Sequence, residues 1–187
     1  MTCRLRSIRL LRLMNSMLFL FRSLLLLSCL TMGLAHAGFE EDDEVKQWTE
    51  AEVEFPPLSR QEDFLMVQVS AATDNQFFID QATLSVGKDG VVRYVLLVLT
   101  QGGARNVSFE GIRCESREHR IYASGRPDGS WSKSRNNSWK RILDQYANRI
   151  SAALFIDYFC PNGVIVRDAA DARDALRRGG HPDTKRF

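Results

Sequence analysis

The chain has 187 residues, with 25 lysines and arginines against 23 aspartates and glutamates, three histidines and four cysteines. Hydrophobic residues make up 44% and charged residues 26% of it, which is typical of a single globular domain. The length excludes a TIM barrel and a two-domain dehydrogenase, and the composition excludes a collagen-like, low-complexity or mostly disordered chain. The net charge of +2 is nearly neutral, but the charges are unevenly distributed along the chain.

The N-terminal segment, residues 1–37, has the composition of a secretory signal peptide. It contains five arginines and no acidic residue, and an apolar run over residues 23–32 follows the last arginine. Small residues in Ala35-His36-Ala37 then predict cleavage after Ala37 and a periplasmic or secreted protein. The mature chain, residues 38–187, keeps 20 basic and 23 acidic residues, for a net charge of −3, and has no predicted membrane span.

Three alternatives stay open for this segment. Residues 13–37 could be retained as a membrane anchor if Arg22 is tolerated within the span. Cys29 lies in a weak lipoprotein cleavage motif, so lipidation is the second alternative. The third is that translation begins at Met14 or Met17, which would shorten the arginine-rich region.

Two cysteines, Cys114 and Cys160, remain after cleavage. Since thiols of exported proteins persist as disulfides, this pair predicts one intramolecular bridge. The alternatives are a metal pair, a redox pair and an intermolecular link. The chain has no Cys-x-x-Cys motif, and no histidine is close enough in sequence to complete a zinc set. The sequence therefore predicts no metal and no cofactor.

Residues 38–63 form an acidic arm, in which ten acidic residues against Lys46 and Arg60 give a net charge of −8. Pro56-Pro57 prevents a helix, so an extended conformation is expected. Apolar side chains spaced along the arm could dock on the core, namely Trp48, Val53, Phe55 and Leu58. The alternative is a solvated leader.

From Phe64 the pattern becomes that of β-strands joined by short turns. Strands are expected over residues 64–69, 77–86, 91–100, 106–115 and 120–126. Gly87-Lys88-Asp89-Gly90 is typical of a tight hairpin turn. Short turns between consecutive strands favour an antiparallel meander.

The periodicity then changes to that of helices. Apolar spacing predicts a long helix from an N-cap at Ser138 to about Phe159, ended by Pro161. A shorter helix is expected over residues 169–178, with Asp168 as its cap.

These elements predict an α+β fold, an antiparallel sheet with both helices packed on one face and one disulfide. The single domain would span residues 64–180 and end in a polar tail over residues 181–187.

Two sequence blocks, residues 106–114 and residues 157–161, carry a resemblance to a known family. With the region around Trp48 and Pro56-Pro57, they resemble the cryptic neisserial protein 1-like family of exported proteobacterial proteins. The likeness covers most of residues 47–178. It implies an envelope location and one domain, and it carries over no catalytic residue.

The two histidines of the mature chain give little indication of catalysis. His119 lies in a charged turn and is expected to be solvated, and His181 lies in the tail and is expected to have no functional role. The chain has no Gly-x-Ser-x-Gly elbow, P-loop or His-Glu-x-x-His helix. No catalytic residue is therefore predicted.

Three carboxylates lie within apolar segments: Asp80, Glu110 and Asp157. Since a buried carboxylate is costly unless it is paired, structural ion pairs with Arg93 and Arg113 are expected. A pair of catalytic carboxylates, as in glycosidases, is the alternative.

Residues 113–141 combine arginines with aromatic residues, and eight basic against three acidic residues give this stretch a net charge of +5. Arginines beside aromatic rings suit an anionic or glycan ligand. The candidate ligand-binding residues are Arg113, Arg117, Arg120, Arg126, Trp131, Arg135, Trp139 and Arg141. The alternative is that the patch neutralises the acidic arm of the same chain or is a solvated face.

The sequence thus predicts a non-enzymatic exported protein that binds an envelope component or a protein partner. Nucleic acid is excluded as a partner because the protein is expected outside the cytoplasm. An envelope hydrolase that uses Glu110 or Asp157 is one alternative, and an assembly factor that docks through its acidic arm is another.

Overall fold

A computed structural model of the chain describes residues 47–58, 63–69, 73–143 and 149–184. The predicted signal peptide, with the alternatives for it, and the start of the acidic arm lie outside these residues. The compact unit Trp48–Phe187 contains all the elements described below.

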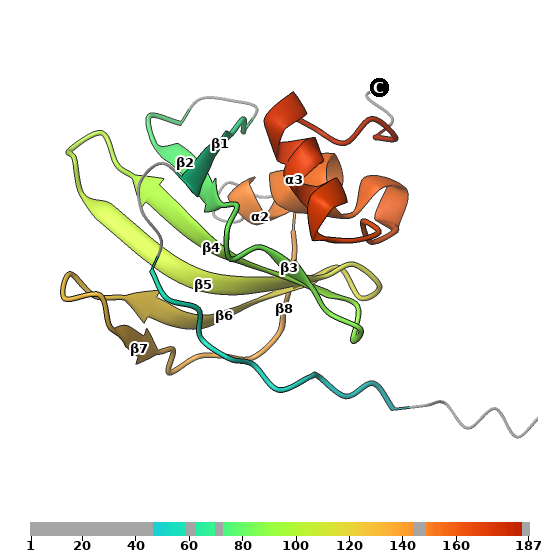
Figure 1. The fold of residues 1–187 in the computed structure, drawn as a ribbon, viewed down its shortest axis with the longest axis horizontal. Coiled ribbons are helices and arrows are strands. Elements are labelled where there is room, and N and C mark those ends of the chain that lie inside the picture. The colour runs from blue at the N-terminus through green and yellow to red at the C-terminus, as the bar shows by residue number, and fades with distance from the viewer. Residues whose placement is uncertain (1–46, 59–62, 70–72, 144–148, 185–187) are drawn as a thin grey trace, which may run out of the picture. The chain divides into compact units, whose positions relative to one another are not determined.

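Among the described residues, eight strands form one antiparallel sheet (Figure 1). They are β1 (Phe64–Val67), β2 (Gln76–Asp80), β3 (Ser85–Val86), β4 (Val91–Leu99), β5 (Arg105–Arg113), β6 (Glu118–Gly125), β7 (Trp131–Lys133) and β8 (Lys140–Arg141). The strand order is β1-β2-β4-β5-β6-β7, with β3 paired to β4 and β8 paired to β6. The meander predicted from the short turns is therefore confirmed.

The strand expected over residues 77–86 is two strands, β2 and β3, because the chain turns between them. Asp80 stabilises this turn, since its carboxylate accepts hydrogen bonds from the Ala82 amide at 2.9 Å and the Thr83 hydroxyl at 2.8 Å. The glycine-rich hairpin follows as expected, and Gly90 adopts a left-handed φ of 77° between β3 and β4.

Alternation along the central strands divides the apolar residues between the two faces of the sheet. On β4, Tyr94 and Leu96 belong to the main core under the helices, whereas Val95 belongs to a second cluster with Phe109 and Tyr122. The sheet is therefore buried on both faces, as the nearly continuous apolar sequence of β4 indicated.

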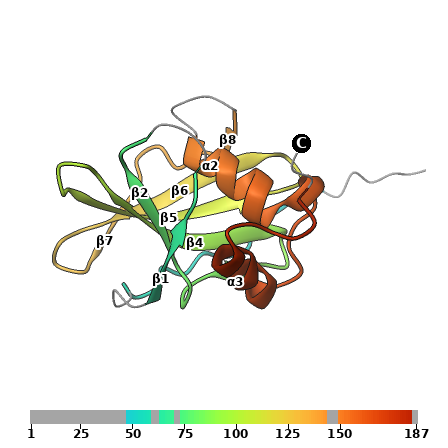
Figure 2. The same ribbon diagram turned by 90° about the horizontal axis from the view of Figure 1, so that it is seen from above.

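The helices cover one face of the sheet (Figure 2). α2 (Arg149–Ala153) continues as the π-helix η3 (Leu154–Phe159), and the short 3-10 turn η4 (Pro161–Gly163) follows at the expected proline. α3 (Ala169–Arg178) packs Ala172, Ala175 and Leu176 into the main core. The predicted α+β class is confirmed.

The expected start of the long helix at Ser138 is wrong. Lys140 and Arg141 instead form β8, which pairs with His119 and Glu118 of β6, and the described part of the helix begins at Arg149. Helical periodicity over this stretch cannot reveal the pairing, because the partner strand lies about twenty residues earlier in the chain.

The predicted disulfide joins Cys114, which follows β5, to Cys160, which follows η3, with 5.6 Å between the two Cα atoms. Both cysteines are buried in the main core. The bridge therefore fixes the end of a central strand to the end of the helix that covers it.

Candidate functional site

The sheet face opposite the helices is covered by residues 48–58, which we call the docked segment (Figure 1). This segment is extended and pairs with no described strand of the sheet. Its side chains Trp48, Glu50, Val53 and Phe55 are half-buried, and the residues between them are exposed. The sequence left docking and solvation open, and in the structure this part of the arm docks.

The Glu50 carboxylate is the centre of the polar contacts on this face. Trp139 Nε1 donates to its Oε2 at 3.2 Å, and Arg93 Nη2 donates to its Oε1 at 3.4 Å. The Tyr122 hydroxyl donates to Oε1 at 2.6 Å, and Arg120 donates to Oε2. These four donors come from β4, β6 and the residue before β8, so the sheet itself builds a receptor for a carboxylate.

Trp48 fixes the N-terminal end of the docked segment. Its indole Nε1 donates to the main-chain oxygen of Asp89 at 2.7 Å, and its ring meets Trp139 edge-on, with 5.9 Å between the centroids. The Arg113 guanidinium lies 4.0 Å from the Trp48 ring centroid, which is a close cation–π contact.

Asp89, in the turn between β3 and β4, is a second anchor. Its Oδ2 accepts a hydrogen bond from the Ala51 amide at 2.9 Å and one from Arg93 Nη2 at 2.6 Å. Burial disfavours the charged carboxylate, but the hydrogen bonds from Arg93 and Ala51 outweigh burial and lower the pKa of Asp89. The hairpin turn therefore positions an ionised group against the docked segment.

Phe55 fixes the other end. Its ring packs edge-on against Phe109 of β5, with 5.9 Å between the centroids, and lies 6.5 Å from the ring of Trp131. The Trp131 indole donates to the main-chain oxygen of Pro56 at 2.7 Å. The aromatic cluster on this face is therefore completed by the docked segment.

Tyr122 lies close over β5 at Gly111, where an added Cβ would lie 2.6 Å from the Tyr122 hydroxyl oxygen. Burial, together with the hydrogen bond to Glu50, raises the pKa of Tyr122 above its ordinary value. The hydroxyl therefore stays protonated and remains a donor to the carboxylate.

The structure divides the eight sequence-predicted ligand residues into two groups. Five make contacts within the chain: Arg113, Arg117, Arg120, Trp131 and Trp139. Three are exposed near the edge formed by β7 and β8: Arg126, Arg135 and Arg141. Of these, Arg126 also donates hydrogen bonds to the Ser130 and Ser132 hydroxyls. Arg120 forms an ion pair with Glu50, so this arginine neutralises part of the acidic arm of the same chain. Binding of an external ligand by the other residues stays a prediction.

Sequence reasoning missed Glu50, Asp89 and Arg93 as parts of this site. Glu50 is one of ten acidic residues in the arm, and composition does not distinguish it from the others. The available signal is its position two residues after Trp48, since an extended chain places both side chains on the same face.

A model of one protein family matches residues 43–177 of this chain. The match covers the docked segment, the sheet and the helices up to the last turn of α3. The chain belongs to the CNP1-like family. The resemblance to the cryptic neisserial protein 1-like family is thereby confirmed. No curated protein and no solved structure matches this chain.

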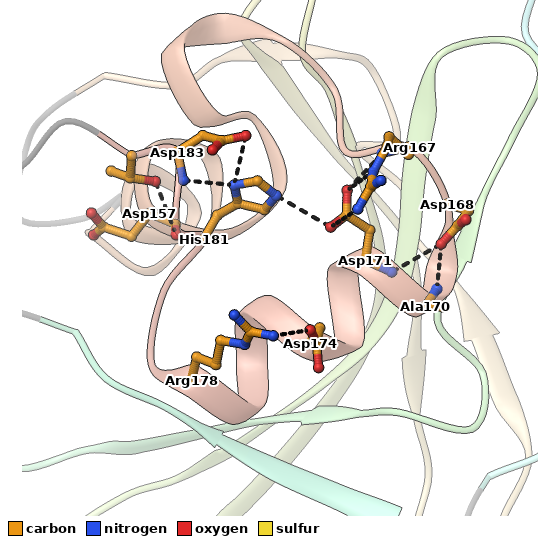
Figure 3. A network of polar contacts seen from close by, with 10 residues as sticks. Asp157, Arg167, Asp168, Ala170, Asp171, Asp174, Arg178, His181 and Asp183 are labelled. Atoms are coloured by element: carbon orange, nitrogen blue, oxygen red, sulfur yellow. Dashed lines mark hydrogen bonds and ion pairs between the residues drawn. The ribbon is translucent and has the colours of Figure 1, made fainter.

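Beyond the family match, this CNP1-like chain has a second polar cluster, in which His181 lies against the first turn of α3 (Figure 3). His181 begins the segment predicted as a polar tail, yet it is buried, with only 8% of it exposed. Its Nδ1 accepts a hydrogen bond from the Asp183 amide at 3.2 Å, so the neutral ring carries its proton on Nε2, 3.3 Å from Asp171 Oδ1. Both ring nitrogens are therefore engaged, and His181 holds the chain end against α3.

A pocket of about 560 Å³ adjoins this cluster, with an apolar wall that includes Val164, Ile165 and Pro182. Its polar wall includes Arg167, whose side chain donates to Asp171 and holds the pKa of that carboxyl at about 2. Asp171 therefore stays ionised across the physiological range and remains a partner for the Nε2 proton of His181.

The ion pair expected for Glu110 is wrong. Glu110 accepts hydrogen bonds from the Ser108 hydroxyl at 2.6 Å and the Tyr94 hydroxyl at 3.2 Å, and burial raises its pKa. Arg93 pairs with Asp89 and Glu50, and Arg113 pairs with Glu115. The physical reason is the alternation of the strands, which puts Glu110 on the helix side of the sheet and these arginines on the opposite side.

His119 lies in β6 and not in a charged turn. It is half-buried, and burial together with the nearby Lys140 lowers its pKa. In the described part of the chain, no group of three or more histidine, cysteine, aspartate or glutamate side chains is arranged so that it could hold a metal ion. Across the same residues, no helix has the length and apolar composition needed to cross a membrane.

Proposed function

We propose that this CNP1-like protein is exported to the cell envelope and acts there as a non-enzymatic binding protein for an anionic surface. The observation that carries the proposal is a row of exposed basic side chains along β7, β8 and the adjoining turns. The row comprises Arg126, Lys133, Arg135, Lys140 and Arg141.

Few acidic groups lie near this row. Within the described residues, none of its five members forms an ion pair, although Glu118 lies opposite Arg141 in the β6–β8 ladder. Asp128 accepts hydrogen bonds from the Ser130 amide and hydroxyl, at 2.9 Å and 2.6 Å, and its carboxylate also interacts electrostatically with Arg126. The row therefore keeps its positive charge towards solvent, which is the arrangement that attracts an anionic surface.

Export is supported by two features of the chain. The disulfide between Cys114 and Cys160 is of the kind that persists in oxidising compartments. The first 37 residues have the charge and apolar pattern of a signal peptide. We expect N-terminal sequencing of the protein from an envelope fraction to begin at Gly38, and a sequence that begins upstream of Arg22 would contradict cleavage.

Binding is tested with lipid vesicles. The mature chain should sediment with vesicles that contain phosphatidylglycerol and not with vesicles of phosphatidylcholine alone, and added salt should release it. The triple variant Arg126→Glu, Arg135→Glu, Arg141→Glu should weaken binding about a hundredfold, since each basic residue near an anionic surface contributes about 1 kcal/mol.

The matched control is the triple variant Lys88→Glu, Arg177→Glu, Arg178→Glu. It makes the same change in net charge at exposed positions in the β3–β4 turn and in the last turn of α3. Equal weakening by both triple variants would show that binding depends on the net charge of the protein and not on this row of residues. Unchanged binding by the first variant would contradict it.

A further inference from the structure

The side chains that hold the docked segment all belong to the rest of the domain, and we call the surface that they form the groove. Arg93, Arg120, Tyr122 and Trp139 surround one carboxylate, and Trp131 takes the main-chain oxygen of Pro56. The docked segment contributes half-buried side chains, chiefly those of Trp48, Glu50 and Phe55, and does not join the sheet. The docked segment is therefore held by a few hydrogen bonds and ring contacts, as a peptide ligand is. Its release would break no strand pairing.

The docked segment does not use all the donors of the groove. The Nε atoms of Arg93, Arg113 and Arg120 are buried and have no hydrogen-bond partner in the part of the chain that the structure describes. Arg93 itself is only 7% exposed. Since buried polar groups are nearly always hydrogen-bonded, these three N–H groups indicate that the groove can take a ligand with more acceptors than Glu50 supplies.

We propose that this groove is a receptor for an extended acidic–aromatic peptide of a partner protein, and that the docked segment is its built-in, displaceable occupant. The docked segment defines the chemistry of the partner. It presents an indole, then a carboxylate two residues later, then an aromatic ring five residues after the carboxylate, at Trp48, Glu50 and Phe55.

Charge complementarity supports an acidic partner. The docked segment carries Glu50, Glu52 and Glu54 and no basic residue, and it faces three arginines of the sheet. A partner peptide with further carboxylates near the one that replaces Glu50 would accept hydrogen bonds from the Nε–H groups that the docked segment leaves without a partner. It would gain charge-assisted hydrogen bonds that the docked segment does not make.

Covalent connection gives the docked segment an advantage over a free peptide. A tethered ligand competes at an effective concentration that reaches the millimolar range. A partner peptide therefore binds measurably only when it has a higher intrinsic affinity or when the docked segment is weakened. This proposal goes beyond the anionic-surface function and uses other residues, so the vesicle experiment and the one below can fail independently.

The probe is a fluorescent peptide with the sequence of residues 47–58, added to the full mature chain. In the variant Trp48→Ala, Glu50→Ala, the groove side chains are unchanged and the tethered competitor is weak. We expect this variant to bind the peptide at least about tenfold more tightly than the wild-type chain does. The milder variant Glu50→Gln should show an intermediate gain, which keeps the test valid if the double variant unfolds.

Two controls establish that binding occurs in the groove. A peptide in which Glu50 is replaced by Gln should lose most of its affinity for the double variant, whereas replacement of the exposed Glu52 should not change it. The added groove change Arg120→Ala should abolish the gain. Equal binding of a scrambled peptide would contradict the proposal, because charge alone would then suffice.

Three further outcomes would overturn the proposal. The first is a folded double variant, judged by its melting temperature, that binds the peptide no more tightly than the wild type. The second is a Glu50→Gln chain that shows no gain at all. The third is a stable mixed dimer between the double variant and the wild-type chain, because the occupant would then be a second copy of the protein.

Discussion

At the scale of single residues, two glutamates of the same chain have opposite environments. Glu50 is surrounded by four donors, two of them arginines, on the face opposite the helices. Glu110 lies on the helix side, with only hydroxyl donors and a raised pKa. The side of the sheet, and not the residue type, decides which donors surround each glutamate.

Replacement of Glu50 by alanine should destabilise the protein. The Glu50 side chain is 15% exposed, and its removal leaves Arg120, the Tyr122 hydroxyl and the Trp139 indole without this acceptor. We expect a loss of about 2 kcal/mol in the free energy of unfolding measured with urea. Glu52→Ala, at an exposed position of the same segment, should change it by less than about 0.5 kcal/mol. Equal effects would mean that the Glu50 contacts contribute nothing specific.

Replacement of Glu110 by glutamine should change the pH dependence of stability. Because folding raises the pKa of Glu110 above its ordinary value of 4.5, the folded state favours the protonated carboxyl. This contribution is complete below the ordinary pKa and is lost as the pH rises through the raised pKa. Glutamine stays neutral, so the melting temperature of the variant should match that of the wild type in acid and exceed it increasingly towards neutral pH. A difference that does not vary with pH would contradict this assignment.

At the scale of elements, α3 is the clearest agreement between sequence and structure. The Asp168 carboxylate accepts hydrogen bonds from the Ala170 and Asp171 amides, and Gly179 ends the helix with a left-handed φ of 71°. Both signals are local, so the sequence carries them without tertiary information. β8 is the opposite case, because pairing with β6 overrides a helical pattern.

The cap of α3 gives a prediction at this scale. Asp168→Ala should lower the free energy of unfolding by about 1 kcal/mol, since two amides of the first turn lose their acceptor. Asp174→Ala is the control on the same helix. It removes only the exposed pair with Arg178, so a loss below about 0.5 kcal/mol is expected from the same urea titration. A loss from Asp168→Ala no larger than that of the control would show that the cap is dispensable.

At the scale of the whole molecule, one sheet is covered on its two faces by different means. Helices α2 and α3 cover one face, and the disulfide fixes the end of η3 to the end of β5. The other face is covered by a peptide segment that is held by aromatic and charged anchors. The helices stay attached to the sheet through the main core and the disulfide. The docked segment depends on a few side-chain contacts, so a partner peptide can replace it in the way proposed above.

The disulfide should be the largest single contribution to stability at this scale. It closes a loop across a sequence separation of 46 residues, which corresponds to about 4 kcal/mol in the chain-entropy description. The double variant Cys114→Ser, Cys160→Ser should lose about this amount in urea unfolding. A reducing agent should lower the wild-type protein to the same level and leave the variant unchanged. Resistance of the wild type to reductant under unfolding conditions would contradict the predicted dependence.

The sequence by itself determined the α+β class, the meander, the cysteine pair and the bounds of α3, because turns, caps and alternation are local signals. It also indicated that arginines and aromatic residues of positions 113–141 act together. It did not determine what they contact. Glu50 meets Arg93, Arg120 and Trp139 across 43, 70 and 89 positions of the chain. Only the tertiary structure decided that contact, because the pleat of each strand and the order of strands select which distant side chains share a face.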